Sequence, residues 1–203
     1  EPGDMLYLPP NVAHHGIAVG ESVTCSIGFR APSSSELLGA LLDSQGIRES
    51  RIADPGLALQ ARPGEITARQ RRQLRGLIRD ALPGDEDLDR WLGRQLTTLP
   101  PSVPPSASGR VLAAPAFLAR LKRGAGLIRA TSVRSAFFRA RNGGIHLFIN
   151  GAEFELPGRS ARLAARITGP GPFRWLPGSN AASRREQALL LRLYRSGLLQ
   201  FSD

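Results

Sequence analysis

Residues 1–32, with the sequence EPGDMLYLPPNVAHHGIAVGESVTCSIGFRAP, decide the fold of this chain. An apolar run at residues 5–8 leads into a Pro-Pro corner, and a second run typical of β-structure follows at residues 22–29. Two such runs on either side of a rigid corner predict a strand, a tight turn and a second strand. His14 lies just beyond the corner. Because a stiff corner fixes the direction of a nearby side chain, His14 is a candidate metal ligand.

The spacing of residues around this corner resembles the second conserved motif of the cupins. Gly3, Pro9 and His14 stand at the glycine, proline and histidine positions of that motif. Asn11 replaces a second glycine, which is a mild departure because Asn tolerates a left-handed backbone better than most residues do. Ala18 stands where many cupins have Asn.

A longer string resembles one branch of the cupins, the bacterial Jumonji-C ribosomal oxygenases, which are arginine hydroxylases of a large-subunit ribosomal protein. The string consists of PGDMLYLPP, His14 and then SIGFRAP, and a weaker resemblance runs through the rest of the chain. It implies an α+β fold made of four regions. These are C-terminal strands of a double-stranded β-helix (the cupin or Jumonji-C barrel) at 1–33, a helical dimerisation region at 34–99, a Pro-rich linker at 100–110 and a winged-helix-like domain at 111–203.

The resemblance also implies a dioxygenase that uses iron(II) and 2-oxoglutarate to hydroxylate a ribosomal protein side chain, with arginine as the expected residue. Relatives hold iron with a His-x-Asp/Glu pair and one distal histidine, and His14 matches the distal histidine. Ser26 would face the barrel and contact 2-oxoglutarate if its strand alternates regularly. Tyr7 would line the substrate channel, unless it packs in the core. Arg30 is not assigned to 2-oxoglutarate, because the anchoring residue of the family lies on an earlier strand.

The chain lacks the other iron ligands of that family. It has three histidines, His14, His15 and His146, and none is followed two residues later by Asp or Glu. A facial iron(II) site needs two histidines and a carboxylate. We therefore expect this sequence to be the C-terminal part of a longer enzyme, cut inside its barrel and inactive alone. His15 stands where relatives often carry another polar residue, so His14 is the preferred ligand.

Other interpretations stay open. A lone histidine in a strand-turn-strand segment is usually a surface or hydrogen-bonded residue. A cupin metalloenzyme of the sugar isomerase type would share the corner but would not usually carry the appended helices. A nucleic-acid-binding regulator would retain only a degenerate cupin. The sequence upstream discriminates among these functions: His-x-Asp supports the oxygenase, His-x-His with a later Glu supports the isomerase, and the absence of both supports the regulator.

Length and composition limit the class of protein. The 203 residues suffice for one large or two small domains. The sequence contains no apolar run of about 18 residues, and its start is acidic, so we expect neither a membrane span nor a signal peptide. The single cysteine, Cys25, excludes an internal disulfide and fits a reducing cytoplasm. We interpret Cys25 as a small core residue rather than a nucleophile.

Positive charge is concentrated at the C-terminal end. The net charge is +10, and residues 111–203 carry 15 Lys and Arg against four acids, which is +11 for that region alone. This concentration favours weak contact of residues 111–203 with ribosomal RNA, with Arg184, Arg185 and Arg192 as candidate contacts. A plain soluble surface is the alternative. The arginines of residues 69–79 are interpreted as a solvated helix face, with an RNA-binding stripe as the alternative.

Periodicity predicts three helices in the middle region. Ser33 and Glu36 form a capping box for a helix that ends near Gly46. Thr67 caps a second helix, which extends to about residue 82, and a third begins at Asp85. Residues 48–65 are interpreted as an irregular loop. The apolar stripes of the helices need a partner, either the barrel or a second subunit, and the resemblance implies a homodimer. The stripe residues are Leu74, Leu77, Ile78, Ala81 and Leu82, then Leu88, Trp91, Leu92, Leu96 and Leu99.

The last region reads as a small mixed domain. Asn150-Gly151 between two alternating runs is a strong hairpin signal for residues 145–149 and 152–156. Gly197 is expected at the end of the last long helix. The remaining expected elements are helices at 115–122, 160–167 and 183–195, strands at 127–128 and 137–138, and a terminal edge strand at 198–201.

Overall fold

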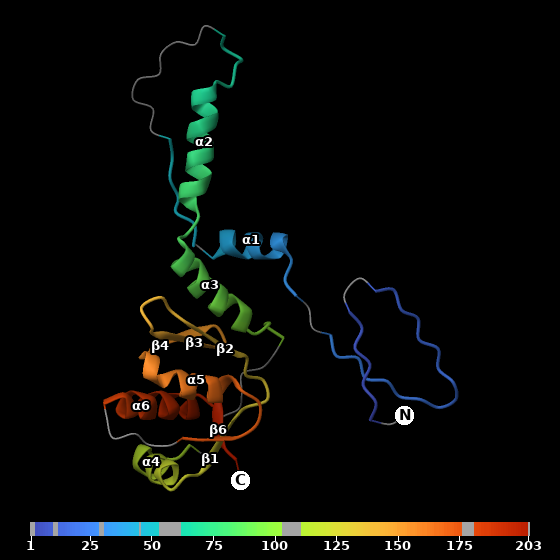
Figure 1. Cartoon of the computed structure of the whole chain (residues 1–203), viewed down its shortest axis with the longest axis vertical. Coiled ribbons are helices and arrows are strands. Elements are labelled where there is room, and N and C mark those ends of the chain that lie inside the picture. Colours follow the sequence, from blue (N-terminus) through green and yellow to red (C-terminus); the bar gives the residue numbers. More distant parts are fainter. Residues whose placement is uncertain are drawn as a thin grey trace. The chain divides into compact units, whose positions relative to one another are not determined.

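A computed structural model describes residues 3–9, 12–28, 31–44, 46–52, 62–102, 111–175 and 181–202 of the chain. Internal contacts divide the chain into two units, Glu1–Ala40 and Leu41–Asp203. The helices and strands form a mixed α+β protein, as the sequence predicts (Figure 1). Most of the expected Pro-rich linker lies outside the described residues.

The first unit does not contain the strands that the sequence predicts. Residues 3–9 and 12–28 form no helix or strand in the structure, and they are drawn as an irregular blue trace in Figure 1. Their apolar side chains, including Met5 and Val23, are exposed. A strand needs a neighbour for its backbone N–H and C=O groups, and the described residues of this unit provide none. Cys25 is also exposed, so its interpretation as a core residue is wrong for this structure.

Helix α1 (Ser34–Asp43) begins at the predicted capping box and ends three residues before Gly46. The backbone N–H of Ser33 donates to Glu36 Oε2 over 2.8 Å, and the N–H of Glu36 donates to Ser33 Oγ over 3.2 Å. These bonds satisfy two of the amide groups that a helix leaves unpaired at its start. The predicted capping box is therefore confirmed.

Helix α2 (Ala68–Ala81) has a second capping box, formed by Thr67 and Gln70. Helix α3 (Asp85–Thr97) follows with three acids in its first turn, where the helix dipole favours negative charge. The two helices differ in burial, because α2 has no buried residue and α3 buries Trp91 and Thr97. No helix among the described residues is long and apolar enough to cross a membrane.

A three-stranded antiparallel sheet forms the middle of the second unit, in the order β2 (Ser135–Arg139), β3 (Ile145–Ile149), β4 (Ala152–Leu156). Asn150 and Gly151, with φ of 48° and 81°, form the predicted turn between β3 and β4. All five residues of β3 are buried. A strand buried on both faces needs two covering layers, and α3 packs on this sheet together with α5 (Ala161–Thr168) (Figure 1).

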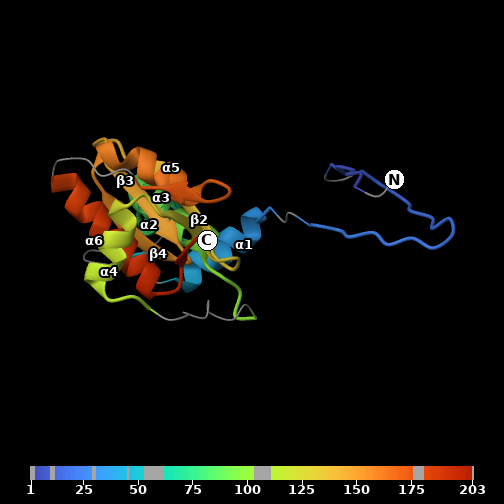
Figure 2. The ribbon, with the colours of Figure 1, turned by 90° about the horizontal axis from the view of Figure 1, so that it is seen from below.

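A second antiparallel sheet has the order β5 (Phe173–Arg174), β1 (Gly126–Arg129), β6 (Leu199–Phe201). β6 is an edge strand, as predicted, whereas the two-residue β5 was not predicted because it is too short to show periodicity. Helices α4 (Ala114–Lys122) and α6 (Ala181–Arg195) lie side by side (Figure 2). Gly197, with φ of 70°, follows α6 at the predicted position. A single-turn helix, η1 (Gly158–Ser160), precedes α5.

Candidate functional site

The imidazole of His14 is exposed, and its Nδ1 lies 3.1 Å from the carbonyl oxygen of Val12. With its proton on Nδ1, the ring donates to this carbonyl and keeps a lone pair on Nε2. Histidines that bind metals usually hold one ring nitrogen in such a bond and use the other nitrogen for the metal. The local geometry of His14 therefore fits a metal ligand.

The other residues predicted for the site lie in the same segment but are not assembled around His14. Tyr7, His15 and Ser26 are exposed, and Tyr7 is 76% exposed. In the described part of the chain, the group of three potential metal ligands that lie together does not include His14. In the described residues, His14 is therefore not part of an assembled metal site. Arg30 lies outside the described residues.

The sequence did not reveal a polar cluster that lies between helix α3 and the β2-β3-β4 sheet. In the strand register, His146 is opposite Phe138 on one side and Glu155 on the other, and Phe148 is opposite Glu153. Side chains that are opposite each other in a sheet lie on the same face. These five residues therefore form one face. The other face of β3 carries Ile145, Leu147 and Ile149, which belong to the main hydrophobic core.

Glu153 is the centre of this cluster. Its Oε1 accepts a bond from Arg90 Nε over 2.7 Å and lies 2.8 Å from His146 Nδ1, and its Oε2 accepts a bond from Arg94. Arg90 also donates to Glu155 over 3.1 Å. Glu153 is 11% exposed and His146 8% exposed in their side chains, so the central carboxylate is largely removed from water.

The cluster changes the acidity of two of its members. Burial alone would raise the pKa of Glu153, but hydrogen bonds from Arg90 and His146, together with the charge of Arg90, outweigh it and hold that pKa below its ordinary value. The hydrogen bond to Glu153 raises the pKa of the Arg90 guanidinium. Both residues are therefore charged at neutral pH, and they tie α3 to β4.

His146, Glu153 and Glu155 are the trio of potential metal ligands found in the described part of the chain, with ligand atoms within 4.8 Å of one another. Both oxygens of Glu153 already accept bonds from guanidinium groups. A cation would have to displace two arginines, which carry like charge. The cluster is better explained as a salt-bridge network that holds helix and sheet together.

Close packing accompanies these ion pairs. A Cβ atom added at Gly93 would overlap the ring of Phe148, which is fully buried. The rings of Phe138 and His146 stack with centroids 4.9 Å apart. Thr97 Oγ1 accepts a bond from the Gly151 N–H over 3.1 Å, which joins the end of α3 to the hairpin turn. The apolar stripe of α3 predicts that this helix packs on the barrel or on a second subunit. In the structure it packs on the β2-β3-β4 sheet.

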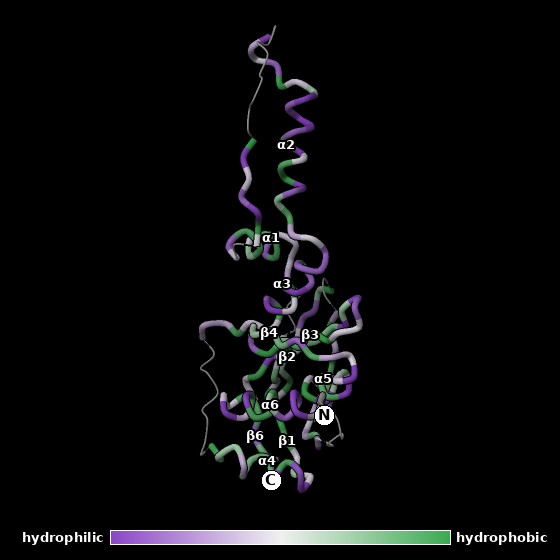
Figure 3. Tube along the Cα trace, turned by 90° about the vertical axis from the view of Figure 1, so that its left-hand side faces the viewer, coloured by the Kyte–Doolittle hydropathy of each residue, from purple (hydrophilic) through white to green (hydrophobic). Residues whose placement is uncertain are grey.

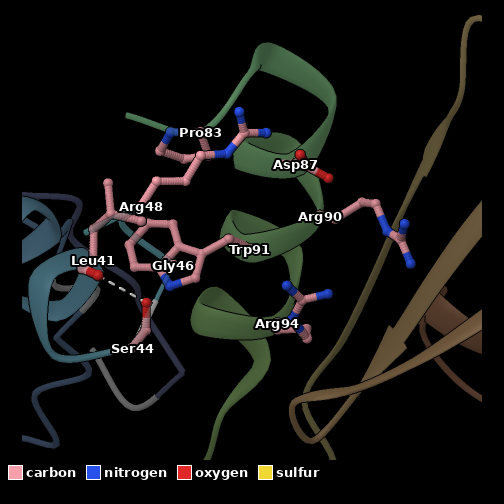
Figure 4. A pocket seen from close by; sticks show the side chains of 9 residues that line it. All are labelled: Leu41, Ser44, Gly46, Arg48, Pro83, Asp87, Arg90, Trp91 and Arg94. Atoms are coloured by element: carbon pink, nitrogen blue, oxygen red, sulfur yellow. Dashed lines mark hydrogen bonds between the residues drawn. The ribbon is translucent and has the colours of Figure 1, made fainter. Parts of the chain in front are cut away.

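A pocket of about 360 Å³ lies between α3 and the segment that follows α1 (Figure 4). Trp91 forms part of its wall, and Arg90 points from α3 toward the strands. No residue of its lining is a histidine or cysteine. The lining residues are Leu41, Ser44, Gly46, Arg48, Pro83, Asp87, Arg90, Trp91 and Arg94.

Replacing Glu153 with glutamine should reduce the free energy of unfolding by about 2 kcal/mol at neutral pH, because it removes a charged acceptor shared by three donors. The pKa of Glu153 is lower in the folded protein than its ordinary value of 4.5. Its stabilising effect is therefore complete above that value and is lost as pH falls through the folded pKa. Urea denaturation near neutral pH and in acid measures both effects.

Glu155→Gln is the matched control, because Glu155 has one of these bonds and its side chain is 67% exposed. We expect a loss well under that of Glu153→Gln. Equal losses for the two variants, or a Glu153→Gln protein whose stability declines in acid as steeply as that of the wild type, would contradict the central role of Glu153.

Comparison with known proteins gives a consistent result. A family model described as JmjC domain matches residues 1–37, which include the whole corner motif. The ribosomal protein uL16 3-hydroxylase of Escherichia coli (strain K12) is 29% identical over 178 residues, which is 82% of this chain and 45% of that protein. A probable ribosomal oxygenase of Haemophilus influenzae is 30% identical over 100 residues, which is 43% of this chain and 24% of that protein.

Solved structures agree in fold. The X-ray structure of E. coli ycfD superposes with a TM-score of 0.68 and 20% identity, over 86% of this chain and 46% of that chain. The same ribosomal oxygenase in complex with cobalt and 2-oxoglutarate gives a TM-score of 0.65 with 21% identity, over 87% of this chain and 48% of that chain. The chain spans less than half the length of the curated relatives it matches. The resemblance predicted from residues 1–32 is confirmed.

Proposed function

We propose that this chain is the C-terminal part of a Jumonji-C ribosomal oxygenase, an iron(II)- and 2-oxoglutarate-dependent enzyme that hydroxylates a ribosomal protein. The observation that carries the proposal is the coincidence of two matches. The JmjC family model covers the segment with the His14 corner, and the similarity to a ribosomal protein hydroxylase extends over 82% of the chain. The finer assignments belong to this proposal: residues 1–33 would form barrel strands in the intact protein, and residues 111–203 a winged-helix-like domain.

His14 is the proposed distal iron ligand. Its Nδ1 is beside the Val12 carbonyl, and its Nε2 would bind the metal. Iron(II) with 2-oxoglutarate supplies the activation of dioxygen that hydroxylation of a carbon requires. Ser26 is proposed to contact 2-oxoglutarate and Tyr7 to line the substrate channel. Arginine is the proposed target residue.

Two further partners are proposed. A second copy would cover the apolar side of α2, where Leu74, Ile78 and Leu82 are exposed, and sedimentation of the intact protein measures this homodimer. Ribosomal RNA would make weak contact with residues 111–203. The proposed contacts are Arg184, Arg185 and Arg192 on α6, which are all exposed; Arg192 also lies over the ring of Phe154. The proposed location is the cytoplasm, where ribosomal proteins are made.

The proposal is tested by succinate formation. The 203-residue chain, given iron(II), 2-oxoglutarate and a ribosomal protein, should produce no succinate above the blank, because it contributes one of three protein ligands. The intact protein should produce succinate under the same conditions. Robust turnover by the 203-residue chain would contradict the ligand assignment. An inactive intact protein would contradict the proposed function.

A further inference from the structure

Helix α2 carries five arginines and one acid, Asp80. Arg71, Arg75 and Arg79 are four residues apart, so they lie along one face of the helix; we call these three residues the arginine ladder. All three side chains are exposed. Figure 3 shows hydrophilic and hydrophobic stretches along α2. Leu74 and Ile78, also four residues apart, lie beside the arginine ladder, because each is three residues from one of its arginines.

The charges of the arginine ladder are not compensated within the described part of the chain. No residue described in the structure forms an ion pair or a side-chain hydrogen bond with Arg71, Arg75 or Arg79. Like charges four residues apart destabilise a helix, and the first turn of α2 has no acid to offset this. An anionic partner would remove that cost.

Several arginines elsewhere in the second unit have structural roles. Arg129 donates to the Gly169 carbonyl and to Ser135, and Arg166 donates to the Arg174 carbonyl. Arg120 stacks over Phe201 at 4.3 Å. These side chains hold the fold of residues 111–203. Their charge is therefore less available to a partner than the charge of the arginine ladder.

The spacing of the arginine ladder fits a phosphate backbone. Residues four apart in a helix are separated by about 6 Å along its axis. Phosphates of one nucleic acid strand also recur at a regular interval of several ångströms, so successive arginines of the ladder can contact successive anions. Guanidinium groups bind phosphate oxygens in a planar, two-bond geometry. An acidic helix can present carboxylates at a similar interval, so the test includes an acidic polypeptide beside RNA.

We propose that the arginine ladder of α2 binds the phosphate backbone of RNA. The choice of RNA over DNA rests on the proposed function, because ribosomal proteins act in contact with ribosomal RNA. The binding is independent of base sequence.

The test compares two variants of the 203-residue chain with equal loss of charge. The ladder variant combines Arg71→Gln, Arg75→Gln and Arg79→Gln, and the control combines Arg51→Gln, Arg62→Gln and Arg69→Gln, all at exposed positions. Gln and Arg have similar helix propensity, so α2 should persist, and circular dichroism checks this. Binding of a labelled single-stranded RNA of about 20 nucleotides is measured by fluorescence anisotropy at about 50 and about 200 mM salt.

For the wild-type chain, each phosphate neutralised contributes about 0.7 to the salt slope. The loss of three contacts should therefore lower the slope of log Kd against log salt by about 2. Between the two salt concentrations, the Kd of the wild type should thus increase by a factor about 20 times larger than the Kd of the ladder variant does. The control should stay close to the wild type. If the ladder variant loses helix, Arg75→Gln is compared with Arg69→Gln, and only Arg75→Gln should lower the slope.

Three results would overturn the proposal: no RNA binding by the wild type at low salt, equal effects of the two variants, or binding of polyglutamate as tight as that of RNA. The last result would assign the arginine ladder to an acidic protein. The assay contains no iron or 2-oxoglutarate. A negative result in this assay therefore does not contradict the proposed hydroxylase function. Conversely, a result that contradicts the hydroxylase function would not change the measured RNA binding.

Discussion

Replacing His14 with alanine in the intact protein is expected to abolish metal binding and to lower turnover by more than about 100-fold. Changes to residues that merely support a metal ligand already cost about 10- to 100-fold, so the loss of a ligand should cost more. The Nδ1 of His14 is beside a backbone carbonyl and its Nε2 is available to a metal. Succinate formation and cobalt titration measure the two effects.

His15→Ala is the matched control for this prediction. His15 is the neighbouring residue, it is exposed like His14, and it lies outside the motif spacing. The His15→Ala protein should keep much of its metal binding and turnover. Equal losses at the two positions, in proteins with unchanged circular dichroism, would show that the motif does not identify the ligand.

Phe148→Ala should lower the free energy of unfolding of this chain by about 3–5 kcal/mol, the range for truncating a buried aromatic ring. Phe148 is fully buried, and its ring fills the space that Gly93 leaves on α3. Its loss would open a cavity between α3 and β3, beside the salt bridges of Glu153. A domain has only about 5–15 kcal/mol of stability, so the variant should be close to unfolding at room temperature.

Phe137→Ala is the control on the neighbouring strand, because Phe137 is 37% exposed. Its truncation should cost less than half as much as that of Phe148. Urea denaturation is followed by tryptophan fluorescence, which reports on Trp91 in α3 and on Trp175 in the main core. Similar costs for the two variants would mean that α3 is not held by the packing described here.

Local signals in the sequence predicted the elements that depend on nearby residues. The capping boxes at Ser33 and Thr67 and the Asn150-Gly151 turn are set by interactions within a few residues, and each is confirmed. The strands expected at residues 5–8 and 22–29 are absent from the described residues. A strand is stabilised by its neighbours, and an apolar run does not show whether those neighbours are present.

The docking of α3 on the sheet was not predicted for a related reason. Its contact surface contains Gly93, Arg90 and Arg94, which look like a solvated face when the helix is read alone. The sequence of the hairpin did contain the matching surface. His146 and Phe148 on one strand, and Glu153 and Glu155 on the next, are each two residues apart and therefore share one face. Charges of opposite sign on a helix and on one face of a hairpin are complementary, but only the fold shows that the two faces meet.

The candidate site was predicted in part. The corner motif identified His14, and the comparisons confirm the family resemblance of that segment. The roles of Ser26 and Tyr7 remain predictions. Both side chains are exposed, and the group of potential metal ligands found among the described residues does not include His14. A site assembled from several strands cannot be built from one segment.

The central claim, that this chain is part of a ribosomal protein hydroxylase, is tested most directly by the mass of the substrate. The intact protein is incubated with iron(II), 2-oxoglutarate and purified ribosomal proteins, and each ribosomal protein is then weighed by mass spectrometry. We predict that one ribosomal protein gains the mass of one oxygen atom, and that this gain disappears when 2-oxoglutarate is omitted. Consumption of 2-oxoglutarate with no mass gain in any ribosomal protein would contradict the claim.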